Sequence, residues 1–196
     1  MKVGLCIASH IGDIDYVVRA EALGYDSAWF ADSQMLWSDC YACLALAADR
    51  TDRIELGTGV AVTGTRPSAV TAASIATINA LAPGRTFLGV GSGNTALRIM
   101  GRPPEKVRDL ERAILELGPL LRGEESEVAF GGETRPIRHL MRDRGFANFD
   151  DPIPLHASGF GPRSLGVVGA HADGAIVSLP PRLDQKSRVQ MMDQSM

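Results

Sequence analysis

Cysteine is scarce in this sequence, with three among 196 residues. An odd and small number of cysteines excludes the disulfide framework of small secreted domains. Cys40 and Cys43 form a C-x-x-C pair, whereas Cys6 lies alone in an apolar run. Because no second pair exists and residues 40–48 have the Ala-rich composition of a helix, we interpret the pair as small apolar core residues and predict no metal site.

Long hydrophobic runs and an excess of basic residues are also missing. The longest apolar stretches are only as long as strands, so the sequence predicts no membrane-spanning helix and no membrane partner. The first residues lack the features of a signal peptide, and we therefore expect a cytoplasmic protein. The chain carries 20 Lys and Arg against 23 Asp and Glu, a net charge of −3. This slightly acidic balance argues against a nucleic-acid partner, which requires a basic face.

Strand-like and helix-like segments alternate along the chain. Strand-like runs occupy residues 3–8, 27–31, 54–62, 86–90, 153–157 and 174–178, and helical patterns occupy 13–23, 40–48, 67–81, 102–122 and 162–169. Several of the strands are continuously apolar, which is typical of parallel strands buried on both faces by helices. The sequence therefore predicts an α/β fold.

Two segments depart from this alternation. Gly118 and Pro119 fall inside the longest helical pattern, and we expect them to kink the helix or to end it early. Residues 124–151 are polar, contain glycine and are locally basic. We interpret them as an excursion from the alternating pattern that can form a hairpin.

Glycine-bearing turns follow the predicted strands. A dinucleotide-binding fold needs a G-x-G-x-x-G turn after its first strand and an acidic residue after its second. Asp32 meets the second requirement, but the turn at 9–13 lacks the glycines, which recur instead after strands three, four and five. Glycine lets main chain approach a flat ligand closely, and a ring of glycines fits the mouth of a TIM (β/α)8-type barrel.

The length sets a limit on that barrel. A closed barrel typically needs ~250 residues, and only six strands are recognisable in this chain. We therefore expect a barrel domain at 1–180, apparently truncated after the sixth strand, and an irregular tail at 181–196. An open sheet leaves two edge strands exposed, which predicts that the chain pairs with a second copy as a homo-oligomer, such as a dimer.

Five stretches carry a family resemblance when their order and spacing are taken together. They are GYDSAWFAD at 24–32, LGTGV at 56–60, APGRTFLGVGSG at 82–93, GFGPRSL at 159–165 and ADG at 172–174. They resemble the luciferase-like monooxygenases, which are flavin- or deazaflavin-dependent oxidoreductases on a (β/α)8 barrel. The segment DSQMLW at 32–37 is most similar to the branch that uses coenzyme F420, which includes methylenetetrahydromethanopterin reductase and glucose-6-phosphate dehydrogenase types.

The resemblance implies roles for individual positions. It implies a non-proline cis peptide at Gly59–Val60, behind the ring of the cofactor. The implied cofactor-binding residues are Asp32, Gly59, Val60, Ala61, Ser92, Gly93, Asn94, Ser158, Gly159, Phe160, Gly161 and Arg163. The implied catalytic candidates are Asp32, His10 and Trp37. Each of these three also has a plainer interpretation, as a cap, a polar loop residue and a loop cover respectively.

Two positions differ from the family pattern. Ser33 stands where some F420-dependent members have histidine, and Asn94 stands where some have glutamate. His10 is then the remaining candidate for a protonatable group near the ring.

The resulting expectation is an enzyme that transfers a hydride between coenzyme F420, or FMN, and a small organic substrate. Two alternatives stay open. One is an FMN-dependent two-component monooxygenase, and the other is a truncated, catalytically silent flavin-binding barrel fragment.

Overall fold

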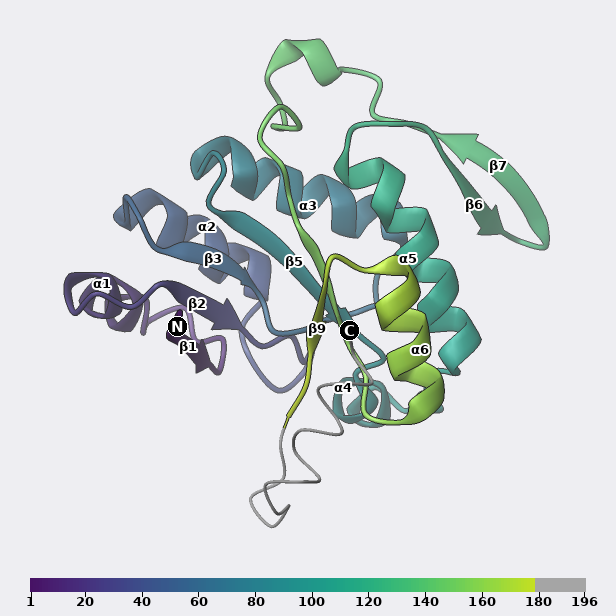
Figure 1. The fold of residues 1–196 in the computed structure, drawn as a ribbon, viewed down its shortest axis with the longest axis horizontal. Helices are drawn as coiled ribbons and strands as arrows, with labels where there is room; N and C mark the ends of the chain where they lie inside the picture. The colour runs from purple at the N-terminus through teal and green to yellow at the C-terminus, as the bar shows by residue number, and fades with distance from the viewer. Residues whose placement is uncertain (179–196) are drawn as a thin grey trace.

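The computed structural model describes residues 1–178 and shows a parallel sheet of seven strands, six of them in the order β1-β2-β3-β5-β8-β9 and the seventh, the two-residue β4 (Ala61–Val62), paired with β5 (Figure 1). The strands are β1 Gly4–Ile7, β2 Ser27–Phe30, β3 Glu55–Thr58, β5 Thr86–Gly91, β8 Leu155–Ser158 and β9 Gly174–Ile176. The order in space follows the order in the chain, without the reversal that defines a doubly wound sheet. The sheet is therefore an open half-barrel, as the sequence predicts.

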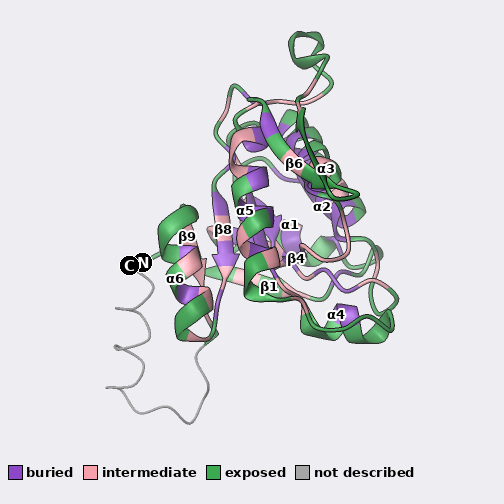
Figure 2. Cartoon of the chain, turned by 90° about the vertical axis from the view of Figure 1, so that its right-hand side faces the viewer, coloured by how far each residue is buried: buried purple, intermediate pink, exposed green. Residues whose placement is uncertain are grey.

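The helices join successive strands and pack against one another in chain order. They are α1 Asp15–Ala22, α2 Cys40–Arg50, α3 Ser68–Leu81, α5 Val107–Leu121 and α6 Pro162–His171, with the short α4 Asn94–Ile99 after β5. Figure 2 shows one side of α5 buried and the other exposed. The largest buried side chains, among them Phe30, Leu44 and Leu88, belong to one core between the sheet and the helices.

The third strand is interrupted at the position that the resemblance implies. β3 ends at Thr58, the Gly59–Val60 peptide is cis, and the chain resumes as β4, Ala61–Val62. β4 pairs with β5 in parallel, and the amide of Gly59 donates to the carbonyl of Phe30 at 2.8 Å. The interruption therefore shifts the chain without detaching it from the sheet.

One finer expectation is confirmed, and two elements differ from the sequence-based prediction. The predicted hairpin is confirmed: β6 Ser126–Phe130 pairs with β7 Glu133–Ile137 in antiparallel register. Of the two expectations for Gly118 and Pro119, the early end of the helix is wrong, because α5 continues to Leu121, and the kink stays a prediction. Gly118 has no Cβ to collide with the proline ring, and the buried leucines on either side hold the last turn in the core. The helix α4 was not predicted.

Aromatic rings fill the concave side of the sheet. Trp29 and Phe87 have ring centroids 4.5 Å apart, and Phe87 lies 5.5 Å from His156. A Cβ on Gly57 would lie 2.3 Å from the Phe87 ring, so this glycine makes room for packing inside the barrel rather than for a ligand. Burial lowers the pKa of the His156 imidazole, against the opposing effect of nearby carboxylates.

The boundary expected near residue 180 and the tail at 181–196 lie outside the described residues. β1 and β9 each have one strand neighbour in the described sheet. The pairing of two copies along such edges stays a prediction.

A buried amide ties the start of β8 to the rest of the fold. Asn79 is completely buried on α3, and its Nδ2 donates to the carbonyls of Asn148 and Asp151 at 3.1 and 3.0 Å. Its Oδ1 accepts from the amide of Gly84 at 3.2 Å and from the hydroxyl of Thr86 at 2.7 Å. Every hydrogen-bonding group of this side chain is therefore satisfied.

We expect Asn79→Ala to lower the free energy of unfolding by about 3 kcal/mol, because it leaves several buried polar groups without partners. Urea unfolding followed by circular dichroism measures the change. Thr77→Ala, an exposed change on the same helix, is the matched control and should cost less than about 0.5 kcal/mol. Equal losses for the two variants would contradict this role of Asn79.

Candidate functional site

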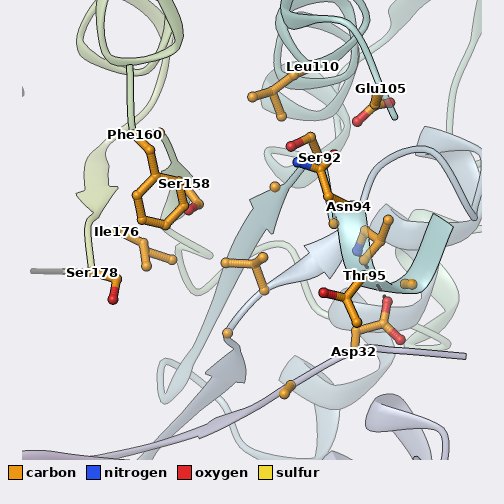
Figure 3. Close-up of a pocket in the computed structure, with 18 of the residues that line it drawn as sticks. Asp32, Ser92, Asn94, Thr95, Glu105, Leu110, Ser158, Phe160, Ile176 and Ser178 are labelled. Atoms are coloured by element: carbon orange, nitrogen blue, oxygen red, sulfur yellow. Dashed lines mark hydrogen bonds between the residues drawn. The ribbon is translucent and has the colours of Figure 1, made fainter. Parts of the chain in front are cut away.

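A cavity of about 660 Å³ lies where the carboxyl ends of the strands meet. Its walls come from β2, β4, β5, β8 and β9 and from the turns that follow them (Figure 3). The lining residues include Ala31, Asp32, Ser33, Trp37, Gly59, Val60, Val62, Gly91, Ser92, Gly93, Asn94, Thr95, Glu105, Leu110, Ser158, Gly159, Phe160 and Ile176. The volume is in the range of sites for small molecules and cofactors.

One wall consists largely of main chain and small aliphatic side chains. It is formed by the cis Gly59–Val60 peptide, by Val62, and by the turn after β5 at 91–93. Gly93 has a φ of +56°, and a Cβ built on it would lie 2.2 Å from Cγ2 of Val62. Val62 is itself fixed, because it packs with Ala96 and Leu97 of α4 in a small buried cluster. Glycine at 93 is thus required for the close approach of β4 to the turn after β5.

Asp32 holds this wall in place. Its side chain is almost fully buried at the end of β2. Its Oδ2 accepts from the amide of Val62 at 3.2 Å and from Nη1 of Arg66 at 2.5 Å, and its Oδ1 accepts from Nε2 of Gln34 at 2.7 Å. The carboxylate therefore links the second strand to the segment just after the cis peptide.

Arg66 completes the network behind the wall. Its Nη2 donates to Asp39 Oδ2 at 2.7 Å, and Asp39 also caps α2 by accepting from the amides of Tyr41 and Ala42. The Arg66 guanidinium lies 5.1 Å from the centre of the Tyr41 ring, within reach of a cation–π contact. Two carboxylates and an aromatic ring thus fix one half-buried cation.

Two large aromatic side chains border the cavity from different elements. Trp37, in the loop after β2, is 40% exposed, and Phe160, in the turn after β8, is 62% exposed. Both line the cavity, and Figure 3 shows Phe160 on the side of Ser158, across from Asp32 and Asn94. Exposed rings at a cavity mouth can cover a flat ligand when it binds.

At the start of α6, part of the implied cofactor site, two backbone amides already have an acceptor within the protein. The amides of Phe160 and Gly161 both donate to Oγ of Ser164, at 3.2 and 3.1 Å. An anion would have to displace Ser164 to use these two donors. Arg163 is exposed and does not line the cavity; it lines the neighbouring groove between α5 and α6.

Three other predicted site residues do not border the cavity. His10 is exposed, and its Nδ1 lies 3.0 Å from Asp13 Oδ2 in its own loop. Ala61 is buried in the core, and Gly161 lies just before α6. The remaining predicted residues line the cavity, and their roles stay predictions.

Two residues of the site were missed by sequence reasoning. Arg66 is 34 positions from Asp32 in a loop before α3, and no local pattern indicates the contact. Glu105 follows two prolines between α4 and α5, and its side chain lines the cavity. Burial raises the pKa of the Glu105 carboxyl, and the hydrogen bond from Thr63 opposes that shift.

The cysteines lie away from the cavity wall. Cys40 and Cys43 are completely buried on α2, and burial raises the pKa of both thiols. Among residues 1–178, no group of three or more His, Cys, Asp or Glu side chains is arranged to hold a metal ion. No helix within the same residues has the length and apolar character needed to cross a bilayer.

The fold is a β/α half-barrel, and the cavity lies at the carboxyl rim of its strands. The sequence profile of the family described as luciferase-like monooxygenase matches residues 12–194. The chain belongs to this family.

Among its relatives, the F420-dependent glucose-6-phosphate dehydrogenase of Intrasporangium calvum is 32% identical over 178 residues, which cover 83% of this chain and 52% of the relative. The 5,10-methylenetetrahydromethanopterin reductase of Methanolobus tindarius is 33% identical over 165 residues, covering 83% and 48%. The chain thus spans about half the length of the curated relatives that it matches.

Solved structures share the fold. An F420-dependent secondary alcohol dehydrogenase in complex with an F420-acetone adduct superimposes with a TM-score of 0.72 at 21% identity, over 89% of this chain and 57% of the other. The oxygenating constituent of 3,6-diketocamphane monooxygenase of Pseudomonas putida, in complex with FMN, gives 0.70 at 18% identity, over 91% and 58%. At these sequence identities, both similarities show a shared fold and nothing more.

Proposed function

We propose that this chain binds a deazaflavin or flavin in the cavity, with coenzyme F420 as the first choice, and takes part in hydride transfer to or from a small organic substrate. The proposal rests on one observation, the cavity wall formed by Gly59–Val60, Val62 and the turn at 91–93, from which no large side chain projects. A wall of main chain and small aliphatic groups, facing a cavity of about 660 Å³, suits a flat ring system. The names of the F420-dependent relatives support the choice of cofactor.

Such a cofactor supplies the hydride chemistry when it is bound, and the protein supplies binding, orientation and electrostatics. In this chain, Asp32 and Arg66 hold β4, and with it this wall of the cavity, in position. Trp37 and Phe160, the two exposed rings that line the cavity, would cover the bound ring and exclude water from it. The side chains of Ser92, Asn94 and Ser158 offer hydrogen-bonding groups at its edge (Figure 3).

A second candidate is an FMN-dependent monooxygenase. Ser33 and Asn94 favour it, because they replace the histidine and glutamate that some F420-dependent members carry. A third is a flavin-binding fragment without turnover, favoured by the edges of the described sheet, where β1 and β9 each have one strand neighbour.

Fluorescence titration of the 196-residue chain with F420 and, separately, with FMN tests the proposal. We expect saturable one-to-one binding of F420 and weaker binding of FMN. Ser92→Trp, which places a large ring in the cavity, should weaken binding at least about tenfold. Tyr16→Trp, on the exposed face of α1, is the matched control and should bind as the unchanged protein does.

Each outcome of the titration has a definite meaning. Tight binding of FMN without binding of F420 would overturn the choice of deazaflavin and favour the monooxygenase. Binding of neither compound would overturn the proposed function. Binding without reduction or oxidation of any tested partner would favour the silent fragment.

A further inference from the structure

The acidic side chains of the cavity are few. Among the described residues that line it, Asp32 and Glu105 are the two with ionisable side chains. Both oxygens of Asp32 already accept hydrogen bonds from protein donors. Glu105 is half-buried and lines this cavity and two neighbouring grooves, one at the start of α5 and one between α5 and α6.

We propose that Glu105 is the proton-exchanging group of this site: a half-buried carboxyl group at the cavity wall, hydrogen-bonded to Thr63, which gives a proton to the substrate or takes one from it during hydride transfer. This inference rests on the proposed function and adds a residue and a role to it.

The hydrogen bonds around Thr63 can serve both protonation states of the Glu105 carboxyl group. The Thr63 hydroxyl has one proton but two acceptors within reach, Glu105 Oε2 at 2.5 Å and the carbonyl of Gly91 at 3.3 Å. When Glu105 carries a proton, it donates to Thr63 Oγ1, and the hydroxyl is free to donate to Gly91. Both hydrogen bonds can then form at the same time, and the two acceptors do not compete for the single Thr63 proton. The ionised carboxylate instead competes with Gly91 for a single donor.

This chain of bonds connects Glu105 to the turn that forms the cavity wall. Gly91 is the last residue of β5 and borders the cavity itself. Thr63 directly follows β4, and its amide also donates to the carbonyl of Gly91 at 3.1 Å. The acid is therefore anchored to the same two segments, β4 and the end of β5, on which the ring is proposed to lie.

The charged groups near Glu105 do not form an ion pair with it. Arg112 on α5 lies 3.2 Å from Asp109, and Arg102 in the preceding loop donates to the carbonyl of Gly64. On the facing loop, Arg66 is shared by Asp32 and Asp39. The other ionisable groups of the groove at the start of α5 are Lys106, which is exposed, and Glu116, which accepts from Ser68 at 2.5 Å. The groove between α5 and α6 adds Arg108 and Arg163, together with Glu111 and His171, which lie 3.6 Å apart.

The balance of these effects agrees with the proposed role. Burial and the negative charge of Asp109 raise the pKa of Glu105, and the Thr63 bond, Arg112 and Arg102 lower it by less. An acid with a raised pKa is better matched to proton transfer near neutral pH than an exposed glutamate is.

The step is written here for reduction of a carbonyl compound. A hydride from the reduced cofactor forms a new C–H bond at the carbonyl carbon, and the π pair of the C=O bond moves to oxygen. The O–H bond of Glu105 breaks, its proton bonds to that oxygen, and Glu105 remains as a carboxylate. The substrate is reduced, the cofactor is oxidised, and Glu105 regains a proton from water. Oxidation of an alcohol reverses each change.

The first test uses the chain without cofactor, so it does not depend on the proposed function. Carboxyl ¹³C NMR follows the titration of Glu105, with exposed Glu125 as the reference in the same spectrum. We expect Glu105 to titrate above the ordinary glutamate value of about 4.3. Thr63→Val, which removes the donor to the carboxylate, should raise the value further. Titration at or below the ordinary value would overturn the proposal.

The second test adds F420. We expect the Glu105 resonance to shift on binding while the Glu125 resonance stays in place. Glu105→Gln should keep the dissociation constant within about twofold and should lower by about a hundredfold the rate with glucose 6-phosphate and F420, or with acetone and reduced F420. Glu125→Gln should change neither.

The outcomes separate the two proposals. Failure to bind F420 overturns the proposed function, and the first test still decides whether the pKa of Glu105 is raised. Binding without a shift at Glu105, or an unchanged rate in Glu105→Gln, overturns the role of Glu105 alone. If neither substrate pair reacts, the titration of Glu105 and the shift of its resonance on F420 binding decide whether the role of Glu105 stands.

Discussion

Replacing Arg66 with methionine is expected to lower the free energy of unfolding by about 3–5 kcal/mol, because it leaves the buried carboxylate of Asp32 without its cation. Methionine keeps most of the apolar stem, so the loss reports the charge rather than the packing. The same change should weaken cofactor binding, since Asp32 also holds the amide of Val62 in the wall of the cavity. Urea unfolding and F420 titration measure the two effects.

Two further variants make this result interpretable. Arg112→Met removes a more exposed cation paired with Asp109, and should cost no more than about 1 kcal/mol. Adding Asp32→Asn to Arg66→Met removes the unpaired charge and should restore part of the lost stability. The account of Asp32 would be contradicted if Arg66→Met cost no more than Arg112→Met.

The second large effect is expected at Gly93. A Cβ at this position would lie 2.2 to 2.9 Å from three side-chain atoms of Val62, which is held by α4. Gly93→Ala must therefore displace either β4 or the turn after β5, and both form the wall. We expect the affinity for the cofactor to fall at least about tenfold. The free energy of unfolding should fall by more than the ~1–2 kcal/mol that a left-handed alanine costs by itself.

The chain contains a matched control for this change. Gly101 has a φ of +70°, close to that of Gly93, but a Cβ there would meet nothing within 4 Å. Gly101→Ala should therefore show the backbone cost alone and leave cofactor binding unchanged. Val62→Ala in the Gly93→Ala background removes two of the three close contacts and should recover part of the affinity. Similar behaviour of Gly93→Ala and Gly101→Ala would show that the close approach to Val62 is unimportant.

The fold was largely predictable because its signals are local. The apolar runs at 54–62 and 86–90 and the glycine turns between helices define the strands of a parallel sheet. The hairpin at 126–137 was predictable from its polar, glycine-bearing sequence. Helix α4 was not, because six residues give no clear period and their helix depends on packing Ala96 and Leu97 against Val62. The end of α5 was mispredicted because Gly118 relieves the clash that proline normally causes.

The site was predictable only in part. The resemblance placed the cis peptide correctly at Gly59–Val60. The partner of Asp32 and the acid bonded to Thr63 lie 34 and 42 positions away along the chain. Contacts at such separations leave no periodic or spacing signal in one sequence. Sequence spacing also could not show why two of the glycines are needed. Gly57 and Gly93 leave room for side chains of the protein itself.

A crystal structure of the chain grown with F420 tests the central claim most directly. The account predicts the ring against Gly59–Val60 and the turn at 91–93, with Glu105 within reach of the substrate side of the ring. A ring bound elsewhere on the molecule, or this wall closed by protein side chains at saturating cofactor, would contradict it.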